Sequence, residues 1–330
     1  MSLQSPLPYN RQNATASGIA SDNASHIAGK IVLVTGVTPG GTGAIFVETI
    51  ARHKPKLLIL AGRTHSKVQA TADKIASDAA NVGVETRVLV LDLASQKQVR
   101  KAAEEVLAYP EPSIDVLVNS AGIMAGPYRT TEEGIELQFG SNHIGHFLFT
   151  NLIVPKIMAS RSPRIINVSS DGHRLSPVRF NDWNFQDGKA YNQWVAYAQS
   201  KSANILFSKA LAQKLGSKGL RSFSLHPGVM LGTSLGPGLD ETDFKELKAL
   251  DKAIGEPFGE DDAGFDLKNS DEMAATHVVA AFDPRLDSFN GAYLENGNVS
   301  QNARSTVTVP GDAEKLWELS EKLIGQQFVY

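Results

Sequence analysis

Short apolar runs alternate with helix-length segments along this chain from Gly29 onward. Each apolar run is bounded by Gly, Pro or polar residues, which is typical of buried strands. Alternation of this kind requires right-handed crossovers, and it predicts a parallel sheet that helices cover on both faces. The predicted strands are 30–36, 57–61, 87–91, 114–119, 164–169 and 221–226, and the predicted helices include 42–53, 66–81, 95–108 and 134–159.

Three segments depart from this alternation. Residues 1–28 are rich in Ser, Asn, Ala and Gln and predict a flexible N-terminal arm. Residues 171–195 form an aromatic-rich insertion, which either lines an apolar substrate pocket or packs as a flap on the sheet edge. Residues 229–268 predict a substrate lid, because irregular stretches of that length are usually functional. Its candidate hinges are Gly232, Gly236 and Gly238.

Composition excludes several classes of partner. The 330 residues carry a net charge of −3 with no basic block, so neither nucleic acid nor an anionic membrane surface is an expected partner. The longest apolar run, 144–154, is too short to span a bilayer, and the N-terminus has no signal pattern. The absence of cysteine excludes disulfides and thiolate metal sites. These features predict a cytoplasmic protein without a membrane span.

A glycine-rich loop follows the first predicted strand directly. The segment Thr-Gly-Val-Thr-Pro-Gly-Gly-Thr-Gly ends at Gly43 and leads into an apolar helix. Glycines at Gly36, Gly41 and Gly43 let the backbone turn tightly and approach a pyrophosphate, whose charge rests on the helix N-terminus. The loop therefore predicts a dinucleotide-binding site.

The end of the second predicted strand indicates which dinucleotide binds. An acidic residue is expected there if a ribose 2′-hydroxyl is to be bound, and none is present. Arg63 instead offers a charged fork that suits a 2′-phosphate. The sequence therefore favours NADP over NAD.

Small and polar residues follow four further predicted strands. Ligands of open parallel sheets bind outside the carboxyl ends of the strands, so these residues are expected to face one ligand. Asp92 is a candidate for the adenine amino group, and the small residues after the fourth strand permit close approach of the cofactor. The candidates are Asp92 and Leu93, then Asn119, Ala121 and Gly122, then Ser169 and Ser170, then Pro227 and Gly228.

Tyr197 and Lys201 stand four residues apart and share one face of any helix that carries them. A nearby ammonium favours the phenolate of a tyrosine, whose free pKa is about 10. A shift of about three units requires about 4 kcal/mol, so a second positive group such as an oxidised nicotinamide is expected beside the lysine. The pair predicts proton exchange near neutral pH.

Taken in order, these motifs resemble the short-chain dehydrogenase/reductase family, with details closest to its retinol-dehydrogenase-like branch. The resemblance covers roughly Gly29 to the end and implies a single doubly wound, Rossmann-type α/β domain over 29–330. It implies a parallel sheet of about seven strands and an NADP-dependent oxidoreductase. The matching segments read TGVTPGGTG, LDL, NSAG, FGSNHIGHF, NVSS, YAQSK and HPG.

The resemblance also implies roles for individual residues. Tyr197 would be the general acid or base, Ser170 would bind the substrate oxygen, and Lys201 would lower the tyrosine pKa and hold the nicotinamide ribose. Asn142 would hold a water that joins Lys201 to solvent. Tyr197, Lys201, Pro227, Gly228, Val229 and Thr233 would contact the cofactor.

Two departures from the family pattern affect the cofactor site. One extra residue around Pro39 and Gly40 leaves open which backbone amides contact phosphate. Thr233, the candidate for the nicotinamide carboxamide, stands one residue later than usual.

The expected reaction interconverts a carbonyl and an alcohol on a small apolar substrate of the lipid, retinoid-like or secondary-metabolite class. Alternatives are a non-catalytic NADP-binding regulatory module and a sugar-nucleotide epimerase or dehydratase. No metal site is expected, because the histidines lack ligand spacing. A homodimer through helices 134–159 and 196–215 is a further expectation, since such pairing is common in the family.

Overall fold

A largely parallel sheet forms the centre of the protein. The computed structural model describes residues 7–230, 235, 241–254 and 267–330. The strands of this part form one sheet in the order β3-β2-β1-β4-β5-β6-β7-β8, parallel throughout except for the β7–β8 pair. The predicted doubly wound α/β fold with about seven strands is confirmed. The strands are β1 (Ile31–Thr35), β2 (Leu57–Gly62), β3 (Glu85–Val90), β4 (Val116–Asn119), β5 (Arg164–Val168), β6 (Arg221–Leu225), β7 (Tyr293–Glu295) and β8 (Asn298–Val299).

The inner strands are buried on both faces, which explains their unbroken apolar runs. Every residue of β1 is buried, and Val34 pairs in parallel register with Leu60 of β2 and Val118 of β4. The chain runs outward from β1 through β2 to β3, then returns to β4 on the other side of β1. This reversal places a crevice at the carboxyl ends of β1 and β4, where ligands of doubly wound sheets bind.

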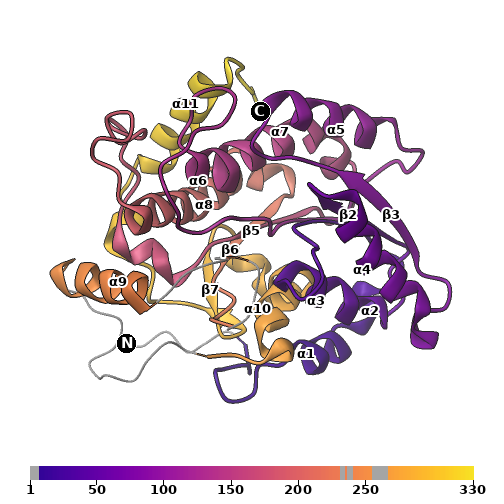
Figure 1. The fold of residues 1–330 in the computed structure, drawn as a ribbon. Helices are drawn as coiled ribbons and strands as arrows, with labels where there is room; N and C mark the ends of the chain where they lie inside the picture. The colour runs from indigo at the N-terminus through magenta and orange to yellow at the C-terminus, as the bar shows by residue number, and fades with distance from the viewer. Residues whose placement is uncertain (1–6, 231–234, 236–240, 255–266) are drawn as a thin grey trace.

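Helices cover the sheet in two layers, each with its own hydrophobic core (Figure 1). One core joins the sheet to the helices at the top of Figure 1, and the other joins it to the helices below. The first layer contains α5 (Gln96–Ala108), α7 (Gly145–Met158), α8 (Gln193–Leu215) and α11 (Asp312–Ile324). The second contains α1 (Ala16–Asp22), α3 (Thr42–Ala51), α4 (His65–Ser77) and α10 (Ser270–Phe282).

The single helix predicted over 134–159 is interrupted. Its chain forms α6 (Leu137–Phe139), one π-helical turn (Gly140–Ile144) and then α7. A Cβ added at Gly145 would lie 2.3 Å from the carbonyl oxygen of Leu93, so glycine lets the start of α7 approach the chain after β3. Single π turns inside helices are frequent at functional sites, and this turn carries Asn142.

The N-terminal segment is folded onto the domain. The prediction of a flexible arm over residues 1–28 is wrong for residues 7–28, which form α1 and α2 (Ala24–Ile27) and extend the second core. Leu7, Ile19 and Ile27 are each at most 5% exposed. Ser17 donates from its backbone and hydroxyl to Asp271 at the start of α10, at 2.8 and 2.6 Å. The polar composition concealed a few apolar residues that pack on α10.

Replacing Ile19 with Ala should therefore lower the free energy of unfolding by about 2–5 kcal/mol, the range for truncating a buried aliphatic side chain. Urea unfolding followed by circular dichroism measures the change. Gln12→Ala, an exposed site in the same segment, is the matched control and should change stability little. Equal stability of Ile19→Ala and the control would show that the segment does not belong to the cooperative unit.

The C-terminal segment covers the helices on which a homodimer was predicted. Trp317 on α11 packs against Phe147 of α7 with ring centroids 4.9 Å apart, and Tyr330 donates to Asn151 of α7 at 2.8 Å. Lys214 of α8 pairs with Glu314 at 2.8 Å. A dimer through α7 and α8 would have to displace this segment from the surface that it covers.

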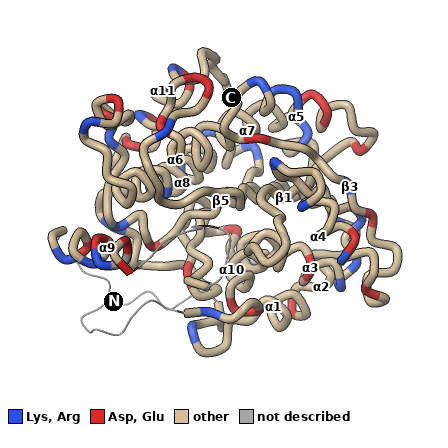
Figure 2. Tube along the Cα trace, viewed as in Figure 1, with Lys and Arg blue, Asp and Glu red and all other residues tan. Residues whose placement is uncertain are grey.

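In Figure 2, the positions of Lys and Arg and those of Asp and Glu are interspersed along the Cα trace, and neither sign gathers on one side of the view. Within the described ranges, no helix combines the length and apolar character needed to span a membrane.

Candidate active site

A large cleft opens at the carboxyl ends of the strands, with a volume of about 1290 Å³. It collects most of the residues predicted to bind the cofactor or act on the substrate. Those that line it are Gly36, Gly41, Gly43, Arg63, Asp92, Leu93, Ala121, Gly122, Ser170, Tyr197, Lys201, Pro227, Gly228 and Val229. Thr233 and the predicted hinges Gly232, Gly236 and Gly238 lie outside the described residues.

The extra residue of the glycine loop is absorbed in a tight turn. Gly41 N donates to Thr38 O at 2.9 Å, and Gly40 between them has φ +78°. Proline followed by a residue of positive φ is the signature of a type II turn. The turn ends at Gly41, which is the N-cap residue of α3. No side chain accepts a hydrogen bond from the first amides of this helix. The first-turn amides of α3 are thus turned toward the cleft without a capping side chain, as anion binding requires.

Two glycines make room for a ligand between β1 and its neighbours. A Cβ added at Gly36, whose φ is +77°, would lie 2.6 Å from Ala121 Cα. A Cβ added at Gly43 would lie 2.8 Å from Gly36 O. The backbones after β1 and β4 therefore approach as closely as glycine allows, and the cradle fits a dinucleotide pyrophosphate.

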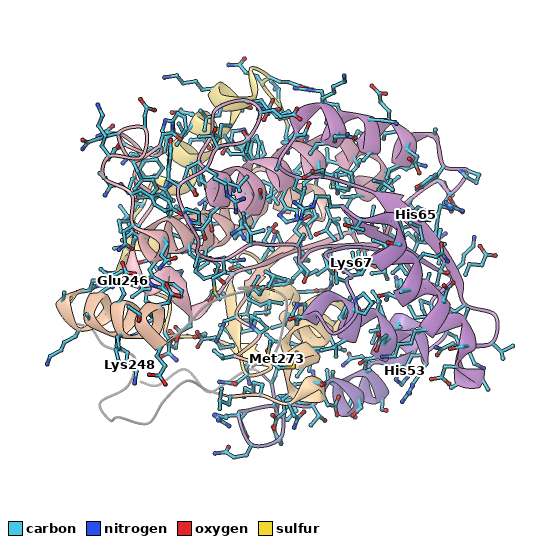
Figure 3. All side chains as sticks on the ribbon, viewed as in Figure 1. His53, His65, Lys67, Glu246, Lys248 and Met273 are labelled. Atoms are coloured by element: carbon cyan, nitrogen blue, oxygen red, sulfur yellow. The ribbon has the colours of Figure 1, made fainter. Side chains whose placement is uncertain are left out.

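A second basic residue accompanies Arg63. Lys67, one turn into α4, also lines the cleft, and both side chains are exposed. Thr64 caps α4 without a side-chain hydrogen bond, so the N-terminus of this helix opens on the same corner. The sequence did not single out Lys67, although its spacing of four from Arg63 is the available signal. In Figure 3, Lys67 lies slightly right of the centre of the view, and Glu246 lies at its left.

Tyr197 lies in the cleft beside Ser170. Its side chain is 5% exposed, and Ser170 lies close enough to lower the pKa of the phenol. A Cβ added at Gly172 would lie 3.0 Å from the Tyr197 ring, so the 3₁₀ turn Asp171–Leu175 holds the ring in place. Ser169 also lines the cleft, but its hydroxyl donates to Lys201 O at 2.8 Å. Of the two serines, Ser170 is the one that contacts the tyrosine.

Lys201 lies below the tyrosine, with Nζ 5.5 Å from the ring centroid, and donates to Val168 O at 3.1 Å. Burial lowers the pKa of Lys201 to about 8. Burial also raises the pKa of Tyr197 to about 12, against the lowering effect of Ser170. The sequence predicts that Lys201 lowers the pKa of the tyrosine, whereas in the structure burial raises this pKa and the lowering contribution comes from Ser170. A phenolate near neutral pH therefore needs a further positive charge in the cleft.

Asn142 does not line the cleft but braces the two chain segments beside it. Its side chain is fully buried and exchanges hydrogen bonds with the backbone of Ile123, at 2.8 and 2.9 Å. It also donates to Ser200 Oγ at 2.9 Å, and Ser200 Oγ donates to Tyr197 O at 2.7 Å. These contacts tie the loop after β4 to the backbone of Tyr197.

A buried network links this brace to the glycine loop. Thr35 Oγ1, at the end of β1, accepts from the backbone amides of Ser120 and Ala121, each at 3.0 Å. The same hydroxyl bonds to His146 Nε2 at 2.9 Å, so Nδ1 of that ring carries the proton and donates to Asn142 O at 3.0 Å. Burial lowers the pKa of His146 to about 4, which keeps the ring neutral. Sequence reasoning did not give Thr35 and His146 this role.

Asn119 lies away from the cleft. It is 1% exposed and donates to Thr150 Oγ1 and Asn167 Oδ1, at 3.0 and 2.8 Å, so its side chain joins β4 to α7 and β5. The sequence predicted that Asn119 contacts the cofactor. In the structure its side chain instead lies in the sheet interior. Side chains alternate between the faces of a strand, and the strand end alone does not show which face a residue takes.

The insertion at 171–195 contributes both to a hydrophobic core and to the lining of the cleft. Phe180 and Trp183 pack against the first hydrophobic core. Tyr191 and Gln193 line the cleft. Trp194 joins a small third core with Leu247 of α9 (Glu241–Ile254), so this described part of the predicted lid lies against the start of α8.

The histidines make structural contacts. His173 Nε2 accepts from Arg304 N at 3.2 Å, so its Nδ1 donates to Ser170 O at 2.8 Å. His143 bonds to Ser320 at 2.8 Å. In the described ranges, no three His, Asp or Glu side chains gather into a possible metal site.

A doubly wound sheet with a glycine cradle, and a Ser–Tyr–Lys group in the same cleft, define the class of nicotinamide-dependent α/β oxidoreductases. Residues 30–181 match the sequence profile of the short chain dehydrogenases. The chain is 37% identical to retinol dehydrogenase 13 of Homo sapiens, over 94% of this chain and 88% of that protein. It is 34% identical to retinol dehydrogenase 12 of Mus musculus, over 95% and 92%.

Among solved structures, it resembles an uncharacterized protein of Mycobacterium Paratuberculosis with a TM-score of 0.68 and 29% identity, over 98% of this chain and 99% of that one. The chain belongs to the short-chain dehydrogenase/reductase family and resembles its retinol dehydrogenases. It is therefore an oxidoreductase of that family, and the nicotinamide cofactor of the family fits the cleft described above.

Proposed function

We propose that the protein is an NADP(H)-dependent oxidoreductase that interconverts a carbonyl and an alcohol, with Tyr197 as the acid and base. The observation that carries this proposal is the position of the Tyr197 phenol, which lies beside Ser170 and above Lys201 in the cleft that holds the glycine cradle.

When bound, the cofactor supplies or accepts the hydride at the substrate carbon. In reduction, Tyr197 gives its proton to the carbonyl oxygen while Ser170 donates a hydrogen bond to the negative charge that develops there. The raised pKa of Tyr197 keeps the phenol protonated and suits this direction. In oxidation Tyr197 accepts the alcohol proton, and the positive charges of Lys201 and of an oxidised nicotinamide favour the phenolate.

Arg63 and Lys67 support NADP over NAD, because both offer positive charge beside the open N-terminus of α4. Replacing both with Ala should raise the KM for NADPH at least about 100-fold, since two hydrogen bonds to a charged group contribute about 1.5–3 kcal/mol each. The KM for NADH should change less than threefold.

Steady-state kinetics with each cofactor measure this shift. Lys74→Ala is the matched control, because Lys74 lies on the same helix and pairs with Glu48 away from the cleft. Equal losses for NADPH and NADH in the double variant would contradict recognition of the 2′-phosphate.

For the substrate we propose a small, largely apolar carbonyl compound or alcohol. The relatives are named for retinol, and Met124, Met230 and Leu235 supply apolar lining in the cleft that contains Tyr197. The test is NADPH oxidation, followed at 340 nm, against a panel of retinaldehyde, aliphatic aldehydes and aromatic ketones. Turnover of at least one member supports the proposal, and NADPH binding without turnover of any member favours the alternative of a regulatory binding module.

A further inference from the structure

Gln193 lies on α8 four residues before Tyr197, so the two side chains lie on the same face of that helix. Its amide oxygen accepts from Gly126 N at 2.9 Å, and Gly126 belongs to the loop after β4. Its amide nitrogen donates to Asp243 at 2.7 Å and to Glu246 at 3.1 Å, both on α9. One side chain thus contacts two separate walls of the cleft.

Neighbouring bonds extend the same contact. Asn192 donates to Glu246 at 2.7 Å. Gln138 donates to the backbone oxygen of Gln193 at 2.9 Å and accepts from Ala125 N at 2.9 Å. The loop after β4, α6 and α9 are therefore all tied to the start of α8.

An apolar contact accompanies these polar ones. Leu247, Leu250 and Ile254 on α9 pack against the cluster of Leu175, Trp194 and Ala198. Asp243 and Glu246 line the cleft, so α9 forms part of its wall. Figure 3 shows Glu246 and Lys248 on α9 at the left of the view, with Lys67 slightly right of its centre. The wall that α9 forms and the proposed 2′-phosphate corner thus border the cleft at different places.

We propose that Gln193 is a positioning residue that fixes the substrate end of the cleft by holding α9 and the loop after β4 against the catalytic helix. A neutral amide suits this position because it accepts from the Gly126 amide and donates to two carboxylates with the same group. A glutamate at this position has the same shape and can still accept from Gly126 N, but it cannot donate to Asp243 or Glu246. The expected change in the KM for a carbonyl substrate rests on the function proposed above, whereas the expected change in the mobility of α9 does not.

The test compares the full-length protein with Gln193→Glu, with the double variant Gln193→Glu/Asp243→Asn, and with Lys248→Ala as a control on the exposed side of α9. The single variant places three carboxylates together, whereas the double variant reverses the direction of the shortest bond. Hydrogen exchange of the backbone amides of 241–254, measured by mass spectrometry, should accelerate at least tenfold in Gln193→Glu. It should return to within threefold of wild type in the double variant and stay unchanged in Lys248→Ala.

The kinetic arm uses the panel carbonyl that the wild-type protein reduces fastest. Gln193→Glu should raise its KM at least fivefold while kcat and the Kd for NADPH stay within threefold, and the double variant should restore KM. Unchanged exchange of α9 in Gln193→Glu overturns the proposal, as does a double variant as impaired as the single one. Because the exchange experiment needs no substrate, a protein that holds α9 in this way but reduces no carbonyl would disprove the proposed function alone.

Discussion

Replacing Tyr197 with Phe should lower kcat for carbonyl reduction by about 10²–10⁴-fold, the contribution typical of a positioned general acid. The change removes only the hydroxyl, so the ring keeps its contact with Gly172 and its place above Lys201. The Kd for NADPH should therefore stay within a few-fold of wild type. Steady-state kinetics with the best panel substrate and fluorescence titration with NADPH measure the two quantities.

Tyr109→Phe is the matched control, because Tyr109 loses only a hydrogen bond to Glu105 on the remote helix α5. Its kcat should equal that of the wild-type protein. Turnover of Tyr197→Phe at the wild-type rate would remove Tyr197 from the chemistry.

Replacing Gly36 with Ala should abolish measurable cofactor binding, with a Kd for NADPH at least 100-fold higher. The added Cβ would lie 2.6 Å from Ala121 Cα and 2.7 Å from Ala121 N, so the backbones after β1 and β4 must move apart. Both backbones line the cleft where the pyrophosphate is expected. Isothermal titration calorimetry with NADPH measures the loss.

Gly40→Ala separates this close approach from backbone strain. Gly40 lies in the same loop with φ +78°, nearly the value at Gly36, but a Cβ there would meet nothing within 4 Å. Both variants therefore pay the left-handed penalty of about 1–2 kcal/mol, and only Gly36→Ala forces the two strand ends apart. Gly40→Ala should change the Kd less than tenfold, and equal effects of the two substitutions would contradict the cradle described here.

The alternating strands and helices of the sheet were predictable from the sequence. Strands such as β1 are buried on both faces and read as unbroken apolar runs, and the crossover rule then orders them. Strands β7 and β8 are three and two residues long and carry too little pattern to be recognised. The N-terminal segment was misjudged because its few apolar residues gain significance only when α10 lies beside them.

In the site, too, residues that belong to local motifs were predictable, and residues defined by long-range contacts were not. Gly36, Tyr197 and Lys201 belong to local patterns that imply their geometry, and they meet in the cleft. Asn119 belongs to an equally suggestive pattern, but only the pairing of β4 with β5 shows that its side chain turns into the interior. His146 and Gln193 act through partners up to 111 residues away in sequence, which no local pattern specifies.

The central claim is that this cleft transfers a hydride between NADP(H) and a carbonyl carbon. Incubation of the protein with NADPH carrying deuterium at both C4 positions and the best panel carbonyl, followed by mass spectrometry of the alcohol formed, tests it most directly. One deuterium should appear on the carbinol carbon with the wild-type protein and none with Tyr197→Phe over the same time. An alcohol product without deuterium from cofactor labelled at both C4 positions, or equal labelling by Tyr197→Phe, would contradict the account.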